Sequence, residues 1–262
     1  MAAPHTYQTR AIVVKQSKIG EADRIVTIYT PGFGKLQAIA KGACRPGSKL
    51  GGNVELLTYS SMMLAKGRNL DIITQSQTID AFPALRNDLW HMACALYTLE
   101  LVDSSTLENS ENSPLFDLLL DTLRCLCQLQ NDESVVRYFE LHLLQHLGYR
   151  PQLRRCVNCD SRLNPVINFF SYSQGGVLCP RCNQKEPTCR PLSVDALKVL
   201  RLWQGCDYAT ASRVKIGPEL SSELEQVMQG YMRCLLQREF KSTAWLQELK
   251  KKSLVDNCHR TN

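Results

Sequence analysis

The sequence lacks the long apolar segments of a membrane protein. It contains no run of about eighteen consecutive apolar residues, which is the shortest length usual for a transmembrane helix. Its first residues, MAAPHTYQTR, contain no apolar stretch like that of a secretory signal peptide. We therefore expect a cytoplasmic protein that makes no membrane contact, in a reducing compartment where disulfide bonds are rare.

Several motifs of common enzymes are also missing. The chain has no G-x-S-x-G, no G-x-G-x-x-G and no His-Glu-x-x-His. Residues 42–49, GACRPGSK, come near a P-loop, but Ser48 and Lys49 are in the wrong order and a predicted strand follows instead of a helix. His142 and His146 are four residues apart on a predicted helix, a spacing that packing explains without a metal. We predict that the protein is not an enzyme and has no catalytic residues.

Charge is present but unevenly distributed along the 262 residues, which carry a net charge of +6. Residues 1–80 contain ten Lys or Arg and five Asp or Glu, whereas residues 81–150 contain four and ten. Residues 151–190 and 191–262 are basic again. This alternation indicates separate modules, and the basic first module suits either a polyanionic ligand or a solvated surface.

The first eighty residues have the pattern of a small β-domain. Short segments rich in β-branched residues alternate with glycine-containing turns such as PGFG and RPGSKLGG. Five strands in about seventy residues fit an OB-fold, a five-stranded Greek-key barrel, although an SH3-like barrel or a short sandwich has a similar strand count. The predicted strands are 8–16, 20–31, 33–43, 53–65 and 69–81.

Beyond Pro83 the apolar period changes to three and four residues, which predicts helices. Ser113-Pro114 marks a helix start. Asn131 and Gly148 fit the N-cap and the C-cap of another helix. The predicted helical segments are 85–99, 113–129, 131–148, 193–203 and 217–237.

These patterns predict an α+β multidomain protein. An N-terminal β domain, for which the OB-fold is one of the three candidate folds, precedes a helical domain that carries an inserted zinc ribbon with four cysteine ligands. The lysine run after residue 250 has the composition of a solvated end. The predicted parts are the OB-fold domain 1–82, the helical domain in two parts, 83–153 and 191–250, the zinc ribbon 154–190, and a flexible tail 251–262.

Four of the twelve cysteines form a metal-binding pattern, C-x2-C-x19-C-x2-C. Each Cys-x-x-Cys turn supplies two thiolates, and zinc prefers four such ligands at tetrahedral corners. The segment VINFFSYS between the turns predicts a strand that brings them together. We predict one structural Zn²⁺ bound by Cys156, Cys159, Cys179 and Cys182.

Other roles for this cysteine cluster fit less well. A catalytic zinc keeps one coordination position open, and a redox Cys-x-x-Cys occurs in a βαβ context that is missing here. Cys189 lies seven residues beyond the last ligand and breaks the spacing. Basic residues near the two turns would balance the negative charge of four thiolates. They could also contact phosphate, but we favour charge balance alone. These bases are Arg154, Arg155, Arg181 and Lys185.

The basic residues of the predicted barrel are candidates for nucleic-acid binding. A strand over KLQAIAK has two faces, one with Lys35, Gln37, Ile39 and Lys41 and the other with Leu36, Ala38 and Ala40. The following turn adds two more cations. Several cations without interleaved acids suit a groove that follows a phosphate backbone. The candidate nucleic-acid-binding residues are Lys15, Lys35, Lys41, Arg45, Lys49 and Arg68.

Aromatic residues of the same region are candidate stacking rings for bases. Packing in the core or in a turn is the more usual role of such residues, and it is the interpretation we favour for each of them. The four rings are Tyr7, Tyr29, Phe33 and Tyr59.

Four stretches together resemble the RecO family of bacterial recombination mediators. They are TRAIVVKQSKIGEADRIVTIYTPGFGKLQAIAKGACRPGSKLGG, FELHLLQHLGYRPQLRRCVNC, FSYSQGGVLCPRC and REFKSTAWLQEL. They occur in the family's order and span nearly the whole chain. Residues 100–130 and the C-terminal end carry little of the resemblance.

The resemblance implies an N-terminal OB-fold, a helical domain and a zinc-binding insertion. It implies binding to single- and double-stranded DNA, annealing of complementary strands, and loading of the RecA recombinase together with RecR. It also implies docking on the C-terminal tail of the single-stranded-DNA-binding protein, for which we expect an apolar pocket with a cation at its rim in the helical domain. By position, Lys35, Lys41, Arg45 and Lys49 match the basic strand and turn of the family.

Two other functions are compatible with parts of the pattern. An RNA-binding protein can also combine an OB-fold with a zinc ribbon. A nuclease would need clustered acids from residues 81–150, and no such cluster is present in the sequence. We predict a non-enzymatic mediator of DNA repair and recombination, located at the nucleoid in the bacterial cytoplasm.

Overall fold

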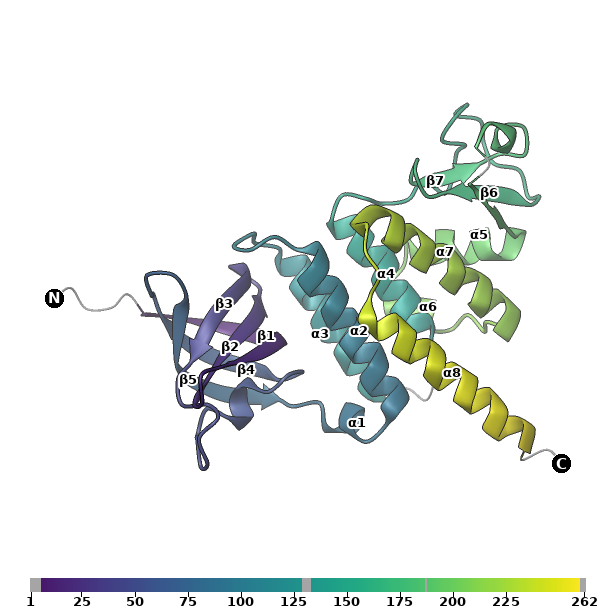
Figure 1. Ribbon diagram of the computed structural model, residues 1–262. Helices are drawn as coiled ribbons and strands as arrows, with labels where there is room; N and C mark the ends of the chain where they lie inside the picture. The colour runs from purple at the N-terminus through teal and green to yellow at the C-terminus, as the bar shows by residue number, and fades with distance from the viewer. Residues whose placement is uncertain (1–5, 129–132, 187, 260–262) are drawn as a thin grey trace. The chain divides into compact units, whose positions relative to one another are not determined.

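The computed structural model describes residues 6–128, 133–186 and 188–259 (Figure 1). The chain divides into two compact units. The first unit contains Met1–Asn131 and Phe240–Asn262, and the second contains Asp132–Glu239. The boundaries between the units therefore fall inside the two predicted parts of the helical domain.

The first unit begins with a closed five-stranded barrel (Figure 1). Its strands are β1 (Thr6–Ile19), β2 (Asp23–Thr30), β3 (Gly34–Ala40), β4 (Tyr59–Ala65) and β5 (Asp71–Asp80). They pair in the order β1-β2-β3-β5-β4, and only the β3–β5 pairing is parallel. A short 3₁₀ helix, η1 (Gly52–Val54), interrupts the long connection between β3 and β4. The predicted N-terminal OB-fold barrel is confirmed.

The core of the barrel follows from the alternation along each strand. In β3, Leu36, Ala38 and Ala40 point inward and are buried, whereas Lys35 and Gln37 lie on the outer face. The predicted two-sided pattern of this strand is therefore correct. Twelve buried residues form the barrel core: Ala11, Val13, Val26, Ile28, Leu36, Ala38, Ala40, Ala43, Val54, Met62, Leu64 and Ile73.

Four helices complete the first unit: α1 (Pro83–Arg86), α2 (Leu89–Ser105), α3 (Ser113–Gln128) and α8 (Lys241–His259). The apolar spacing after Pro83 predicts one continuous helix. Instead α1 ends early and α2 starts afresh, because the Asp88 side chain caps α2 by accepting a hydrogen bond from the backbone N–H of His91 at 2.8 Å.

Helix α8 joins the first unit through its own N-terminus. The carboxylate of Glu100 on α2 accepts hydrogen bonds from the backbone N–H groups of Lys241 and Ser242, each at 3.0 Å. The helical backbone continues through residues 251–259, where we expected a flexible tail, and residues 260–262 lie outside the described residues.

The second unit contains the other helices, α4 (Ser134–His146), α5 (Val194–Trp203), α6 (Tyr208–Ala211) and α7 (Pro218–Leu236). Gly148 ends α4 as predicted. Its φ of +83° lets the backbone N–H of Tyr149 reach the carbonyl of Leu144 at 2.8 Å, as in a Schellman motif. Asn131, the expected N-cap, lies outside the described residues.

Between α4 and α5 the chain forms a three-stranded sheet in the order β7-β6-β8. Its strands are β6 (Asn168–Ser171), β7 (Gly176–Leu178) and β8 (Arg190–Leu192), and a 3₁₀ helix, η2 (Asn183–Lys185), precedes β8. A side chain at Gly176 would meet the backbone oxygen of Gln152 at 2.7 Å, which explains the glycine there. This small sheet holds the cysteine pairs.

Candidate metal centre and nucleic-acid interface

The four predicted metal ligands meet at one point of the second unit. The Sγ atoms of Cys156, Cys159, Cys179 and Cys182 all lie within 4.8 Å of one another. They come from two tight turns on either side of the β6–β7 hairpin. The structure therefore brings the sequence-predicted cysteines together in an arrangement that can form a zinc site.

Backbone geometry fixes each of the two turns. In the first, the N–H of Asp160 bonds to the carbonyl of Cys156 at 2.9 Å, and Asp160 takes a left-handed φ of +55°. In the second, the N–H of Cys182 bonds to the carbonyl of Cys179, also at 2.9 Å. Each turn thus aims two thiols at the same space.

Hydrogen bonds favour the thiolate of Cys159, and the thiolate is the metal-binding form of cysteine. The hydroxyl group of Ser161 lies 3.1 Å from Cys159 Sγ. Hydrogen bonds from the side chain and backbone of Ser161, with a smaller contribution from Cys156, lower the pKa of Cys159 to about 6. The backbone N–H of Cys179 points to the Sγ of Cys156 at 3.4 Å.

The pKa of Cys179 is also lowered. The pKa of Cys182 is raised to about 11, because the opposing hydrogen bond from Asn158 is outweighed by burial and by hydrogen bonds with the other thiols. Four adjacent thiols fit a tetrahedral metal ion with a closed coordination shell.

Basic residues and a further cysteine lie near the cluster. Arg155, one of the bases expected to balance its charge, forms an ion pair with Asp160 at 2.7 Å, so its charge is already shared. Arg154 and Arg181 are exposed. Cys189 packs beside the cluster but is not one of the four thiols that meet.

On the barrel, two of the six candidate DNA-binding residues are paired with one acid of α2. Lys15 Nζ lies 3.3 Å from Asp103 Oδ2, and Lys35 Nζ lies 3.6 Å from Asp103 Oδ1. Lys35 also donates a hydrogen bond to the backbone carbonyl of Asp103, and its side chain is only 12% exposed. A polyanion would have to compete with Asp103 for both lysines.

Three other candidates lie in the connection from β3 to β4 and are differently placed. Lys41, Arg45 and Lys49 are exposed, and none of them forms an ion pair with another described residue. Together with their neighbours they form a basic loop, defined here as residues 41–51.

Backbone hydrogen bonds brace the basic loop. The N–H of Gly42 donates to the Asp23 carboxylate at 2.7 Å, and the N–H of Cys44 donates to the carbonyl of Ala22 at 2.9 Å. Gly42 and Gly47 take the left-handed conformation that its turns require, with φ of +67° and +75°. The loop therefore presents its cations from a fixed backbone.

Arg68 lies elsewhere on the barrel, in the turn from β4 to β5, and is exposed. No pattern in the sequence singles out its neighbour Lys66, which pairs with Asp71 at 3.6 Å and lies over the ring of Tyr7 at 5.0 Å. No pattern in the sequence indicates the role of Asp103 either. A helical acid carries no signal that it will meet lysines 68 and 88 residues earlier in the chain.

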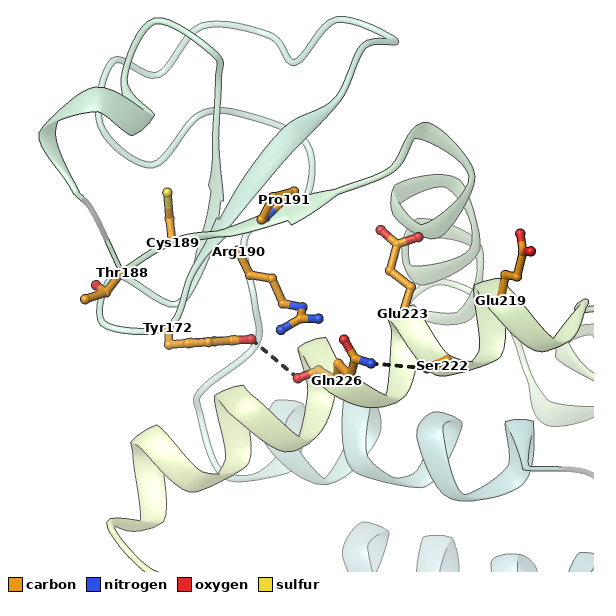
Figure 2. Close-up of a pocket in the computed structure, with 9 residues that line it drawn as sticks. All are labelled: Tyr172, Thr188, Cys189, Arg190, Pro191, Glu219, Ser222, Glu223 and Gln226. Atoms are coloured by element: carbon orange, nitrogen blue, oxygen red, sulfur yellow. Dashed lines mark hydrogen bonds between the residues drawn. The ribbon is translucent and has the colours of Figure 1, made fainter. Parts of the chain in front are cut away.

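The second unit also contains a groove of about 620 Å³ between β8 and α7 (Figure 2). Figure 2 shows the Arg190 side chain directed toward α7, beside the hydroxyl group of Tyr172. Glu219 and Glu223 line the same groove, and Glu223 accepts hydrogen bonds from the backbone N–H and the hydroxyl of Ser193 at the start of α5. One guanidinium beside two carboxylates does not suit an acidic peptide tail.

Among the described helices, none is both long enough and apolar enough to cross a membrane.

Comparisons with known proteins match most of the chain. The family model "Recombination protein O N terminal" matches residues 1–82, and "Recombination protein O C terminal" matches residues 86–244. A DNA repair protein RecO from Dehalococcoides mccartyi is 42% identical over 254 residues, which cover 97% of this chain and all of the relative. A relative of the same name from a Roseiflexus species is 41% identical over 244 residues, or 93% of this chain and 86% of its own. Another from Halalkalibacterium halodurans is 30% identical over 250 residues, or 95% and 98%.

Proposed function

Because the chain belongs to the recombination protein O family, we propose that it is a DNA-binding recombination mediator of DNA repair, acting in the bacterial cytoplasm without enzymatic activity. It binds single- and double-stranded DNA, anneals complementary strands and, with RecR, helps to load the RecA recombinase. It also contacts the C-terminal tail of the single-stranded-DNA-binding protein. Family membership supports these roles.

The observation that carries the DNA-binding proposal is the difference among the barrel cations. Lys15 and Lys35 share Asp103, whereas Lys41, Arg45 and Lys49 are exposed on the braced basic loop without an acidic partner among the described residues. Unpaired cations on a fixed backbone release counterions from a phosphate chain without first breaking an ion pair. We assign the main phosphate contacts to the basic loop.

Annealing follows from contacts of this kind. Lysine and arginine side chains that neutralise phosphates leave the base edges free. Two strands whose backbones are neutralised repel each other less, and base pairing then supplies the free energy that joins them. No step of this mechanism requires nucleotide hydrolysis.

We also propose that Cys156, Cys159, Cys179 and Cys182 hold one structural Zn²⁺. Four thiolates within 4.8 Å of one another complete its coordination shell, so the ion stabilises the fold and has no open position for a substrate. Elemental analysis of the purified, reduced protein tests this assignment. We expect one equivalent of zinc, and less than half an equivalent of any metal would contradict it.

The DNA-binding proposal is tested by removing two charges in two ways. Lys41→Gln with Arg45→Gln should weaken binding to a labelled single strand by roughly 10-fold or more at 0.1 M salt. Each phosphate contact contributes about 0.7 to the slope of log affinity against log salt concentration, and this variant loses two contacts. The matched control, Lys15→Gln with Lys198→Gln, removes two exposed cations that are paired with Asp103 and Asp195. It should change affinity less than about 2-fold.

Equal losses in both variants would show that net charge, and not the basic loop, determines binding. The same titration with an RNA strand of identical sequence tests the alternative function. An RNA affinity well above the DNA affinity would replace the proposed mediator with an RNA-binding protein.

A further inference from the structure

Four aromatic residues of the barrel are candidates for stacking on bases, and the structure separates them into two pairs. Tyr29 and Tyr59 are buried, and both lie within 6.5 Å of the ring of Phe116 on α3. They are part of the core of the first unit and cannot reach a ligand. Tyr7 and Phe33 are at least partly exposed, and their ring centroids are 4.8 Å apart at an interplanar angle of 52°.

The Tyr7 ring is held in place from two sides. Its hydroxyl group donates a hydrogen bond to the Asp71 carboxylate, and the Lys66 ammonium lies over the ring at 5.0 Å from its centroid. Burial, together with the bond to Asp71, raises the pKa of Tyr7 above its ordinary value, so the hydroxyl stays a donor at neutral pH. The Tyr7 ring is therefore held in a fixed position, and a second ring can pack against it.

Phe33 is exposed because a braced turn presents it. Its backbone N–H donates to the hydroxyl of Thr30 at 3.1 Å, and that hydroxyl donates to the carbonyl of Gly34 at 3.0 Å. Ser113 on α3 donates to the carbonyl of Pro31 at 2.8 Å. The turn is thus ordered on both sides, and Phe33 as a residue remains 38% exposed.

A single exposed apolar side chain is common on protein surfaces. What distinguishes Phe33 is its surroundings. Its aromatic partner Tyr7 is held in place, and the β4–β5 turn carries two cations: Lys66, which lies over the Tyr7 ring and is paired with Asp71, and Arg68, which is exposed and forms no ion pair with another described residue. An exposed ring whose aromatic partner lies beside a turn with an exposed cation matches the chemistry of a single-stranded nucleic acid, in which an unpaired base stacks on the ring while a phosphate meets the cation.

We propose that Phe33, supported by Tyr7, is a stacking platform for an unpaired base of a single strand, with Arg68 of the β4–β5 turn as its phosphate partner. This inference rests on the proposed DNA binding and gives it a second contact, separate from the basic loop. In a duplex the bases are stacked inside, so the platform acts on single strands only. It gives the barrel a means of preferring single strands to duplexes.

The test compares Phe33→Ala and Phe33→Trp in the full chain, with Leu107→Ala as the control. Leu107 is 78% exposed and apolar, but it is not a ring. Phe33→Ala should weaken binding to an oligothymidine strand by about 5- to 150-fold, the range expected when a stacking ring is removed. Binding to a duplex of the same length should change less than about 2-fold. Phe33→Trp should retain the affinity, and its added fluorescence should be quenched by the single strand.

An abasic oligonucleotide gives an independent readout. It offers phosphates but no bases, so wild type and Phe33→Ala should bind it equally. A Phe33→Ala variant that binds oligothymidine as wild type does, or that loses single-strand and duplex binding alike, would overturn the platform. So would an equal loss in Leu107→Ala. If wild type binds neither single strands nor duplexes, the proposed function fails as well, and the two failures are thereby distinguished.

Discussion

The barrel and the cysteine module, residues 154–190, are both small β structures, but they have very different cores. Twelve buried residues fill the barrel, and all of them are apolar. The cluster at the centre of the cysteine module has four buried residues, of which only Leu178 is not a cysteine. A closed barrel with its own core is stable without a ligand, whereas so small a cluster needs another source of stability. In the proposed function, a metal ion bound by the four cysteines would supply to the module what apolar burial supplies to the barrel.

The largest effect expected from this comparison is the loss of the metal. Cys179→Ser removes one ligand, and structural zinc contributes about 10–16 kcal/mol in zinc-finger peptides, so the module should lose its fold. Hydrogen exchange should show fast-exchanging amides in β6 and β7 and unchanged protection in β1–β5. Cys234→Ser, at an exposed cysteine outside the cluster, should leave both regions protected. Slow exchange in the module of a metal-free Cys179→Ser protein would refute the comparison.

The reverse experiment weakens the core of the barrel and leaves the four cysteines unchanged. Ile28→Ala should cost about 2–5 kcal/mol of unfolding free energy, because Ile28 is fully buried in the barrel core. The metal content should remain at the wild-type level. Ile79→Ala, a matched change at a side chain that is 52% exposed, should cost much less. Urea unfolding of both variants measures the difference, and equal costs would mean that the barrel core does not determine its stability.

Local features of these two regions could be predicted from the sequence, whereas long-range contacts could not, and the reason is physical. The cysteine spacing is local, and each Cys-x-x-Cys turn fixes its own geometry, so all four clustered thiols could be named in advance. Gly148 was predictable for the same reason, because a helix end needs its left-handed conformation locally. The capping of α8 by Glu100 joins groups 141 residues apart in sequence. No local pattern encodes such a contact.

The ion pairs of Lys15 and Lys35 with Asp103 could not be predicted for the same reason. They support a third prediction, whose expected effect on stability is intermediate. Asp103→Asn should destabilise the first unit by about 1–3 kcal/mol, because Lys35 is mostly buried and would lose its charged partner. Asp121→Asn breaks a well-exposed pair with Arg124 and should cost less than about 1 kcal/mol. Thermal unfolding compares the two variants. A larger loss in Asp121→Asn would contradict the pairing described here.

The smallest effect concerns pH and the second unit. Burial lowers the pKa of His142 below its ordinary value, although the bond of its Nε2 to the carbonyl of Trp203 at 2.9 Å opposes the shift. A histidine with a lowered folded-state pKa contributes its full stability above the unfolded pKa of about 6.5, and that contribution declines as the pH falls below this value toward the folded pKa. Urea unfolding at pH 7.5 and 5.5 should therefore show a loss at the lower pH, and the loss should be smaller in His142→Gln. An unchanged pH dependence in the variant would exclude His142 as its source.

The same contrast between paired and unpaired groups underlies the central claim that the basic loop contacts DNA phosphates. The most direct measurement is the slope of log affinity for a single strand against log salt concentration, for wild type and for Lys41→Gln with Arg45→Gln. If both cations neutralise phosphates, the slope should become shallower by about 1.4, since each contact contributes about 0.7 on a single strand. A variant whose slope equals that of wild type, with affinity unchanged at every salt concentration, would contradict the assignment of the DNA contacts to the basic loop.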